Sequence, residues 1–501
     1  MRLVQVRDLL AGQGWFDTVQ HRMDTPFGLA MHWSRLVDAP LALLMQASES
    51  FALRAWPLLL FLAALLLLAR IAFALAGTRA VAVVSALALL CTGLYATFAP
   101  GNIDHHGVAL VLMLAALLGV IERRPHLSAV VVALGLGVGL ESLPYALAAI
   151  GFWAMQEKAR AFGFTLAGMA ILLLAATTAD PYRLMPVCDT YSLFHAALLA
   201  VGGAGIAAIS FLPRHRLAAF AALALLLLAL AMMLNPACLA GPYAGMDARL
   251  KLIFLDRINE ARPVWQFFRL SPAQVVGGYF YALFAIAMTL FAPKNRARLI
   301  VMVFAAVALV VATFQYRGVN FAILFALPGL AAGLAMLTKK RSIVWLAVAI
   351  LVASGGAFTL AGALAEGQDK VAGRAMRFEA QQACGHQPAM AALKALPPGR
   401  VAAFVDQGPA VLAYTGDAVI AGPYHRGRAG ILDSYEIFAG KNPQALLQKR
   451  GIAYLMTCRA APDWEFYRQP GGLIAQLAAG QIPQWLTPAG KSGDVEVYRV
   501  R

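Results

Sequence analysis

Long apolar runs alternate with short polar stretches along most of the chain. The runs cover residues 51–76, 80–99, 108–121, 127–140, 145–155, 162–178, 191–212, 217–234, 275–291, 299–314, 319–337 and 343–364. Most of them approach the ~20 residues that a helix needs to cross the hydrocarbon core of a bilayer. This pattern predicts about twelve transmembrane helices.

Residues 127–155 form either one long helix or two short helices broken at Glu141-Ser142-Leu143-Pro144. Basic residues decide between these alternatives, because Lys and Arg hold short loops on the cytoplasmic side. A break puts all the basic clusters on one side, whereas a single long helix moves the later clusters to the other side. The clusters are Arg79, Arg123 with Arg124, Lys158 with Arg160, Arg214 with Arg216, Lys294 with Arg296 and Arg298, and Lys339 to Arg341. We therefore predict the break, and six cytoplasmic basic loops.

This topology puts residues 1–50, the loop 236–272 and residues 365–501 on the non-cytoplasmic side. The first fifty residues are rich in polar and aromatic side chains, which predicts a segment folded against another part of the protein. The alternative is an interfacial segment anchored by Trp15 and Trp33. The predicted organisation is an extracytoplasmic or interfacial segment (1–50), a transmembrane domain (51–364) and a soluble domain (365–501).

The soluble domain has the pattern of a small α/β fold. Apolar strands are predicted at residues 401–405, 418–421, 452–457 and 495–500, with helices at 388–396 and 443–450. About 130 residues suffice for an independent fold. Cys384 and Cys458 both fall here, and outside the cytoplasm they are predicted to form a disulfide, with two free buried thiols as the alternative.

Composition agrees with a membrane protein. The 501 residues are 61% hydrophobic and 13% charged, whereas a soluble protein is roughly 45–50% apolar and about 25% charged. The basic loops explain most of the net charge of +16, so no nucleic-acid partner is expected. The predicted fold class is a polytopic α-helical membrane protein with a small C-terminal α/β extracytoplasmic domain.

Asp104, His105 and His106 form a polar turn between two of the apolar runs. Ionisable groups at a membrane surface cost free energy unless they face water, a partner or a metal. Asp104 and His106 offer an oxygen and a nitrogen within reach of one divalent cation. The alternative is a helix N-cap at Asp104 followed by solvated histidines.

Three further residues on the same predicted side have two interpretations each. Glu141 is a base or acceptor contact, or a polar residue at a helix break, which we favour. Glu260, in the loop 236–272, is a site residue or a solvated carboxylate. Arg317, at a helix end, binds a phosphate or extends its charged group to the membrane–water interface.

The order of these features resembles the catalytic subunits of oligosaccharyltransferases, which are C-type polytopic glycosyltransferases. Asp104-His105-His106 resembles the second acidic motif of that family, and Ile258-Asn259-Glu260 is similar to its Ile-x-Glu signature. Arg317 matches in position the arginine on the lipid-linked diphosphate. Val405-Asp406-Gln407-Gly408 resembles the Trp-Trp-Asp-Tyr-Gly motif that reads the acceptor.

The resemblance implies a metal-assisted transfer of a sugar from a polyprenyl-linked donor to a protein, lipid or glycan acceptor. Asp104, His106 and Glu260 are the implied ligands of Mg or Mn, and Asp104 and Glu260 are the implied catalytic residues. Arg317 and Asp406 are implied to bind substrate. Tyr424 and His425 line the acceptor groove or belong to a surface loop. The expected location is the bacterial inner membrane.

Two departures from the family pattern bear on function. Phe404, Val405 and Gln407 stand where the acceptor motif has tryptophans and tyrosine, so the acceptor differs from an asparagine sequon. The family's first helix and first acidic motif would precede Met1, which suggests a start upstream. The alternatives are a transferase that uses a lipid-monophosphate sugar to modify lipid or polysaccharide, and a non-catalytic transporter or scaffold.

Overall fold

The computed structural model describes residues 1–501 except residues 181, 213 and 245. Its internal contacts divide the chain into two compact units. Unit 1 comprises Met1–His32, Met246–Ile258 and Gly367–Arg501, and unit 2 comprises Trp33–Gly245 and Asn259–Glu366. The predicted segments divide the chain differently, because residues 1–32 group with the C-terminal residues rather than with residues 33–50.

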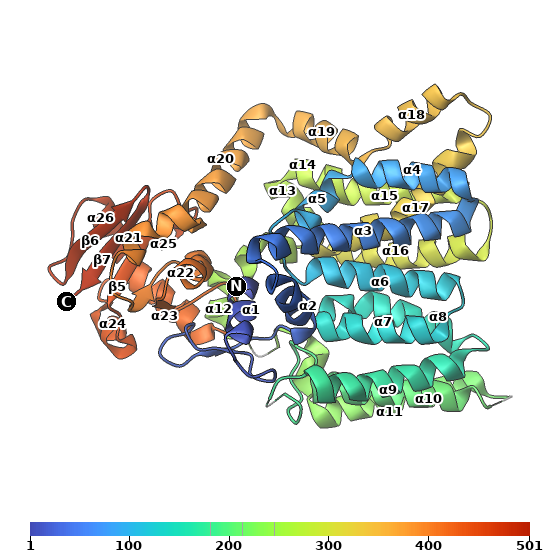
Figure 1. The fold of residues 1–501 in the computed structure, drawn as a ribbon, viewed down its shortest axis with the longest axis horizontal. Helices are drawn as coiled ribbons and strands as arrows, with labels where there is room; N and C mark the ends of the chain where they lie inside the picture. The colour runs from blue at the N-terminus through green and yellow to red at the C-terminus, as the bar shows by residue number, and fades with distance from the viewer. Residues whose placement is uncertain (181, 213, 245) are drawn as a thin grey trace. The chain divides into compact units, whose positions relative to one another are not determined.

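Unit 2 is a bundle of helices (Figure 1). Its helices are α2 (Arg35–Met45), α3 (Glu49–Ala76), α4 (Thr78–Leu89), α5 (Thr92–Phe98), α6 (His106–Ile121), α7 (Pro125–Val138), α8 (Leu143–Ala154), α9 (Ala159–Thr177), α10 (Leu193–Ile209), α11 (Arg216–Leu234), α13 (Val264–Leu270), α14 (Pro272–Val275), α15 (Tyr281–Met288), α16 (Arg296–Phe314), α17 (Val319–Leu337), α18 (Ile343–Val352) and α19 (Gly355–Glu366). Each apolar run of the sequence contains at least one of them, because a chain that crosses lipid must satisfy its backbone polar groups internally.

The helix α17 lies at the core of unit 2. In its most apolar stretch 89% of the residues are buried, against 6% for α11. It contacts α3, α4, α15 and α16, and Gly333 leaves no room for a Cβ beside the carbonyl oxygen of Met288. Small residues allow such close approach between helices. The apolar side chains of α11 are mostly exposed, as expected for a helix that faces lipid.

Six of the described helices are long and apolar enough to cross a membrane, or up to eight if each bent pair is one span. The bent pairs are α4 with α5 and α18 with α19. Three shorter apolar helices are α6, α7 and α10. The structure thus supports a polytopic helical protein, but the predicted count of about twelve crossings is not confirmed.

The predicted break near Pro144 is confirmed, and the chain reverses there. His106, the first residue of α6, is hydrogen-bonded to Glu141, which lies between α7 and α8. At the other end, Gln156 lies just after α8 and lines one cavity with Arg123, which follows α6. The helices α6 and α8 therefore run in the same direction, and α7 returns between them.

The six basic clusters lie at one end of the bundle, as the loop charges predicted. Arg123, Lys158 and Arg296 line the same cavity. Further contacts at this end are Asn295 Nδ2 to Leu75 O (3.0 Å), Arg79 Nη2 to Thr338 O (2.8 Å) and Arg160 Cζ to the ring of Phe211 (3.6 Å). Asp104, before α6, lies at the opposite end.

Unit 1 contains a mixed five-stranded sheet in the order β4-β3-β5-β7-β6. Its strands are β3 (Arg400–Ala402), β4 (Ala418–Val419), β5 (Tyr454–Cys458), β6 (Leu486–Ser492) and β7 (Val495–Val500). Strand β3 is parallel to β4 and β5, whereas β7 is antiparallel to β5 and β6. The four predicted strands are present, and β6 is an additional edge strand.

Unit 1 also contains nine α-helices among its described residues. They are α1 (Arg2–Leu10), α12 (Ala248–Ile253), α20 (Gln368–Gly385), α21 (Ala391–Lys394), α22 (Gly408–Tyr414), α23 (Arg428–Ala439), α24 (Gln444–Arg450), α25 (Trp464–Tyr467) and α26 (Leu473–Ala478). The short pair β1 (Val19–Gln20) and β2 (Leu29–Ala30) also belongs to this unit.

The N-terminal segment is folded against the sheet, as its polar composition predicted. Met23 forms a bridge with Val419 of β4, and Thr25 N donates to Val419 O at 3.0 Å. Arg22 donates to the carbonyl oxygens of Leu412 and Thr415. These contacts fix residues 22–25 to the edge of the sheet.

Two disulfides cross-link the chain. Cys384 at the end of α20 is joined to Cys458 at the end of β5, with a Cα–Cα distance of 6.0 Å, so that prediction is confirmed. Cys188 and Cys238 form a second disulfide in unit 2, which the sequence analysis missed.

Candidate active site

The turn between α5 and α6 carries Asp104, His105 and His106. Gly101 has φ +92°, a left-handed conformation that glycine adopts without strain. The side chain of Asn102 accepts a hydrogen bond from Asp104 N at 3.2 Å, which holds the turn. Asp104 Oδ1 in turn accepts from His105 N at 2.6 Å.

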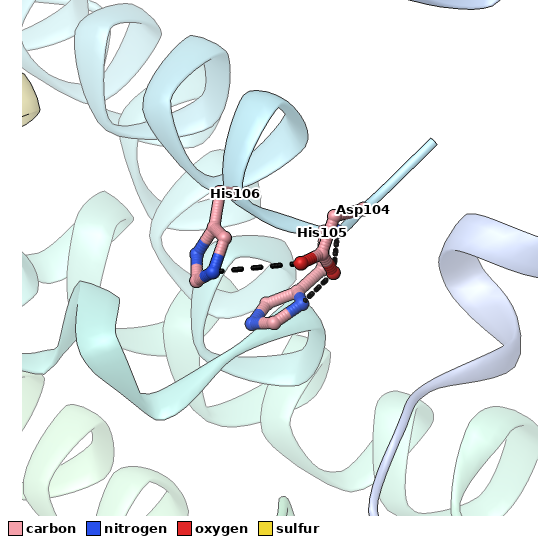
Figure 2. A group of neighbouring side chains, drawn as sticks. All are labelled: Asp104, His105 and His106. Atoms are coloured by element: carbon pink, nitrogen blue, oxygen red, sulfur yellow. Dashed lines mark hydrogen bonds and ion pairs between the residues drawn. The ribbon is translucent and has the colours of Figure 1, made fainter. Parts of the chain in front are cut away.

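The carboxylate of Asp104 contacts both imidazoles (Figure 2). Its Oδ1 lies 2.5 Å from Nδ1 of His105, and its Oδ2 lies 3.5 Å from Nε2 of His106. The two rings lie side by side, with centroids 4.2 Å apart. The N-cap position of α6 belongs to His105, without a side-chain cap, so the alternative of Asp104 as a helix cap is wrong.

Glu141 completes this group from the connection between α7 and α8. Its Oε1 lies 2.8 Å from Nδ1 of His106 and 3.9 Å from Nε2 of His105. Gly139 permits this packing, since a Cβ there would come within 3.0 Å of Cδ2 of His105. Glu141 lies at the helix break, as we favoured, and its side chain, which is 13% exposed, also pairs with His106. The sequence offered one signal for this pairing, because Glu141 is a lone carboxylate between two apolar runs.

Glu260 and Arg317 lie on two adjacent short segments, Asn259–Ala261 and Tyr316–Gly318. Tyr316 N donates to Arg262 O at 2.9 Å, which ties the segments together. The charge of Glu260 acts on His106, and the charge of Arg317 acts on Glu141. The segment Asn259–Ala261 and the α16–α17 connection therefore reach the same end of unit 2 as Asp104.

The guanidinium of Arg317 has unused hydrogen-bonding capacity. Its Nε is buried and has no hydrogen-bond partner among the residues that the structure describes. A buried donor without a partner is costly, and an anionic oxygen at this position would satisfy it. Glu260, by contrast, is exposed.

The predicted acceptor-binding residues all lie in unit 1. Asp406 belongs to the short helix Val405–Gln407 and is near Asp463, whose Oδ1 accepts from Arg257 Nη2 at 2.7 Å. Desolvation, followed by the charge of Asp463, raises the pKa of Asp406 to about 6, although the residue as a whole is exposed at the surface. The guanidinium of Arg257 also stacks on the ring of Phe466 at 3.5 Å.

Tyr424 and His425 are half-buried rather than freely exposed. The ring of His425 lies 4.5 Å from that of His32, centroid to centroid. Gly427 N donates to Tyr424 O at 2.8 Å, so the loop that carries them is a closed turn.

Asp104 and His106 fit a divalent cation by their geometry. Ligand atoms of Asp104, His105 and His106 all lie within 4.8 Å of one another. Two atoms that are each about 2.1 Å from one ion lie roughly 3.0–3.5 Å apart at octahedral or tetrahedral angles. The 3.5 Å between Asp104 Oδ2 and His106 Nε2 matches this separation.

Comparisons with known proteins find likeness in structure alone. No protein-family model and no curated protein matches the sequence. The Archaeoglobus fulgidus oligosaccharyltransferase in its apo form matches with a TM-score of 0.63 and 14% identity, over 91% of this chain and 65% of that chain. The archaeal oligosaccharyltransferase AglB from the same organism, with an inhibitory peptide and a dolichol-phosphate, matches at 0.63 and 14%, over 94% and 67%. The A. fulgidus complex with Zn and sulfate matches at 0.59 and 15%, over 99% and 68%.

These matches define the class of fold. This chain has the fold of the C-type polytopic glycosyltransferases, and its structural neighbours are archaeal oligosaccharyltransferases. The resemblance drawn from the Asp-His-His turn is thus confirmed at the level of the fold. The chain spans about two thirds of the length of these neighbours.

Proposed function

We propose that the chain is a membrane glycosyltransferase that moves a sugar or oligosaccharide from a polyprenyl-(di)phosphate carrier to an extracytoplasmic acceptor. The observation that carries this proposal is the meeting of four separate stretches of chain at one end of the bundle. Asp104 with His106, Glu141, Glu260 and Arg317 come from these stretches. Nothing local in the sequence forces them together.

Asp104 and His106 are the proposed ligands of a divalent cation, Mg or Mn, with Glu260 as a further ligand. When bound, such a cation neutralises negative charge on a phosphate leaving group. Glu141 orients His106, because its carboxylate can only accept and therefore holds the proton on Nδ1. The Nε2 atom of His106 is then left for the cation.

Arg317 is the proposed phosphate contact. A guanidinium presents several donors to a phosphate at once, and its buried Nε lacks a partner among the described residues. A neighbour of the same fold binds a dolichol-phosphate, which supports a lipid phosphate as the ligand class. Catalytic roles are proposed for Asp104 and Glu260, which act at the same phosphate.

The acceptor is proposed to bind at Asp406, Tyr424 and His425. A neighbour of the same fold holds a peptide, which supports an acceptor site in this class of fold. Phe404, Val405 and Gln407 replace the aromatic residues of the family motif, and all three are buried. This observation favours an acceptor other than an asparagine sequon, such as a lipid or a polysaccharide, with a lipid-monophosphate sugar as the alternative donor.

The test is sugar transfer by the full chain in lipid nanodiscs. Short-chain polyprenyl phosphates and diphosphates carrying radiolabelled hexoses or N-acetylhexosamines serve as donors, in the presence of MnCl₂. We expect release of sugar from at least one donor, and loss of at least about 100-fold with Asp104→Ala, comparable to losing one stabilising electrostatic contact at a reaction centre.

The matched control is Asp369→Ala, an exposed aspartate in α20 of unit 1. This variant should transfer at the normal rate. Normal transfer by Asp104→Ala would refute the proposed site. Binding of the donors without release of sugar under any condition would favour the transporter or scaffold alternative.

A further inference from the structure

A second site lies at the end of unit 2 opposite to Asp104. It is a cavity of about 700 Å³ between α8, α16 and the α6–α7 connection. The helix α6 begins at His106 and ends at Ile121, two residues before Arg123. Sixteen helical residues span about 24 Å, so the cavity and the Asp104 turn lie at the two ends of the same helix.

The rim of the cavity is basic. Arg123, Lys158 and Arg296 line it, together with one carboxylate, Glu157, so these side chains carry a net charge of +2. The positive charges of Arg123 and Arg296 repel each other. A rim of this kind attracts an anion.

The hydrogen bonds of Lys158 and Arg296 go to neutral oxygens. Lys158 Nζ donates to Arg123 O at 3.4 Å, and Arg296 Nη2 donates to Gln156 Oε1 at 2.8 Å. Arg123 has φ +56° because it occupies the left-handed position of the turn that ends α6, where Arg124 N donates to Gly119 O at 2.9 Å.

The inner wall of the cavity is apolar and opens among lipid-facing side chains. Leu147, Phe152 and Val303 line it, and Leu147 is 56% exposed. Met155, which is 76% exposed, lies beside the basic rim. Cations at helix ends above an apolar wall match the two halves of a phospholipid, whereas inorganic phosphate has no apolar part that could pack on that wall.

We propose that this cavity binds the headgroup of an anionic phospholipid, with Arg123, Lys158 and Arg296 on its phosphate and an acyl chain along Leu147 and Phe152. The site is separate from the proposed transfer site, and it lies among the six basic clusters that predict the cytoplasmic side. The lipid would hold the connections α6–α7, α8–α9 and α15–α16 together at the membrane surface.

The experiment uses the full chain, purified in detergent and stripped of lipid. Phosphatidylglycerol and phosphatidylcholine with identical acyl chains are added, and the midpoint of thermal unfolding and the bound lipid in native mass spectrometry are measured. We expect phosphatidylglycerol to bind at least about tenfold more tightly than phosphatidylcholine and to raise the midpoint. The double variant Arg123→Gln/Arg296→Gln should lose this tenfold preference, because it removes two of the three cations proposed to contact the phosphate.

The control variant is Lys340→Gln, an exposed lysine of the α17–α18 connection, predicted to lie on the same side but outside the cavity. It should keep the full preference, and so should Asp104→Ala, which separates this proposal from the transfer function. If the double variant does not fold, Lys158→Gln replaces it, with a smaller loss expected.

Three results would overturn the proposal. One is equal binding of the two lipids. Another is an unchanged preference in the cavity variants. The third is a midpoint shift of the same size from inorganic phosphate alone, which would indicate a simple anion site.

Discussion

The Nδ1 atom of His106 lies 2.8 Å from Oε1 of Glu141, so a carboxylate between α7 and α8 holds the imidazole that begins α6. The other ring nitrogen, Nε2, lies 3.5 Å from Oδ2 of Asp104. A histidine held in this way presents Nε2 and the carboxylate of Asp104 to one point. Histidines that bind a metal through one ring nitrogen usually donate the other N–H to a carboxylate in this way.

Replacing Glu141 is expected to weaken metal binding more than it weakens folding. Glu141→Leu should lower the affinity for Mn²⁺ about 10–100-fold, because losing a hydrogen-bond partner of a metal ligand has an effect of that size. Glu141→Gln keeps an accepting oxygen without its charge, and we expect a smaller loss. Electron paramagnetic resonance of free Mn²⁺ measures the affinity directly, without any need for turnover.

Glu122→Gln is the matched control, because Glu122 forms ion pairs with Arg70 and Arg124 beyond the other end of α6. It should bind Mn²⁺ as the unmodified protein does. A normal Mn²⁺ affinity in Glu141→Leu would remove the positioning role, while a loss of the same size in both variants would indicate a general structural effect.

Arg317 is expected to set the affinity for a lipid phosphate. Arg317→Gln should weaken binding of a short-chain polyprenyl phosphate about 10–100-fold, the loss for hydrogen bonds to a charged group. Arg317→Lys keeps the positive charge but lacks the planar set of donors of a guanidinium, so it should retain only part of the affinity. Fluorescence titration with a labelled lipid phosphate gives both constants.

Arg269→Gln, an exposed position at the end of α13, serves as the comparison. Equal weakening by Arg269→Gln and Arg317→Gln would mean that general surface charge, rather than a specific contact, attracts the lipid. In that case Arg317 has no special role at the phosphate.

The sequence predicted what depends on local pattern. The apolar runs located the helices of unit 2, because a spanning segment must be apolar and helical in the hydrocarbon core. Loop charge located the break near Pro144, because Lys and Arg stay on one side of the membrane. Strand β6 was missed, since Leu486–Ser492 contains Pro488 and Gly490 and has Leu486 as its single large apolar residue. An edge strand tolerates such residues, so its sequence need not show the apolar pattern that predicts a strand.

Contacts between distant segments were harder to foresee. Cys384 and Cys458 were paired because both fall in one predicted domain, whereas Cys188 and Cys238 lie in two loops that no pattern brings together. The role of Glu141 was missed for the same reason, because only the return of α7 beside α6 brings it to His106. The grouping of residues 1–32 with the C-terminal sheet likewise depends on tertiary contacts.

Asp406 is expected to make the stability of unit 1 depend on pH. The folded protein holds the proton of Asp406 up to a pKa of about 6, above the model-compound value of 3.8. Its contribution to stability is therefore fully present below about pH 4 and is lost as the pH rises through about 6. Asp406→Asn removes this loss, so its unfolding midpoint should rise relative to that of the unmodified protein between about pH 4 and pH 6, and the difference should then stay level.

Thermal unfolding at a series of pH values tests this, with Asp369→Asn as the comparison, since Asp369 is exposed. Arg257→Gln should raise the apparent pKa of Asp406 further, because the charge of Arg257 lowers it. A pH profile of Asp406→Asn that runs parallel to that of the unmodified protein would show that Asp406 titrates at an ordinary pKa.

The N-terminal segment is expected to depend on Arg450, whose side chain is 1% exposed. Its guanidinium lies 2.6 Å from Asp24 Oδ1 and 2.7 Å from Asp433 Oδ2, and it donates to Thr25 O at 2.9 Å. Arg450→Met leaves two carboxylates, each less than a fifth exposed, without their partner. Breaking a buried ion pair in this way costs about 3–5 kcal/mol.

Arg468→Met gives the matched comparison, because Arg468 forms an exposed ion pair with Glu465 in the same unit. Exposed pairs contribute about 0–1 kcal/mol, so this variant should unfold nearly as the unmodified protein does. Limited proteolysis of Arg450→Met should also release residues 1–32 before the sheet unfolds, since Asp24 and Thr25 lose the side chain that fastens them. Equal stability of the two variants, with the N-terminal segment still protected, would show that the bridge at Met23 and Val419 is sufficient to hold the segment.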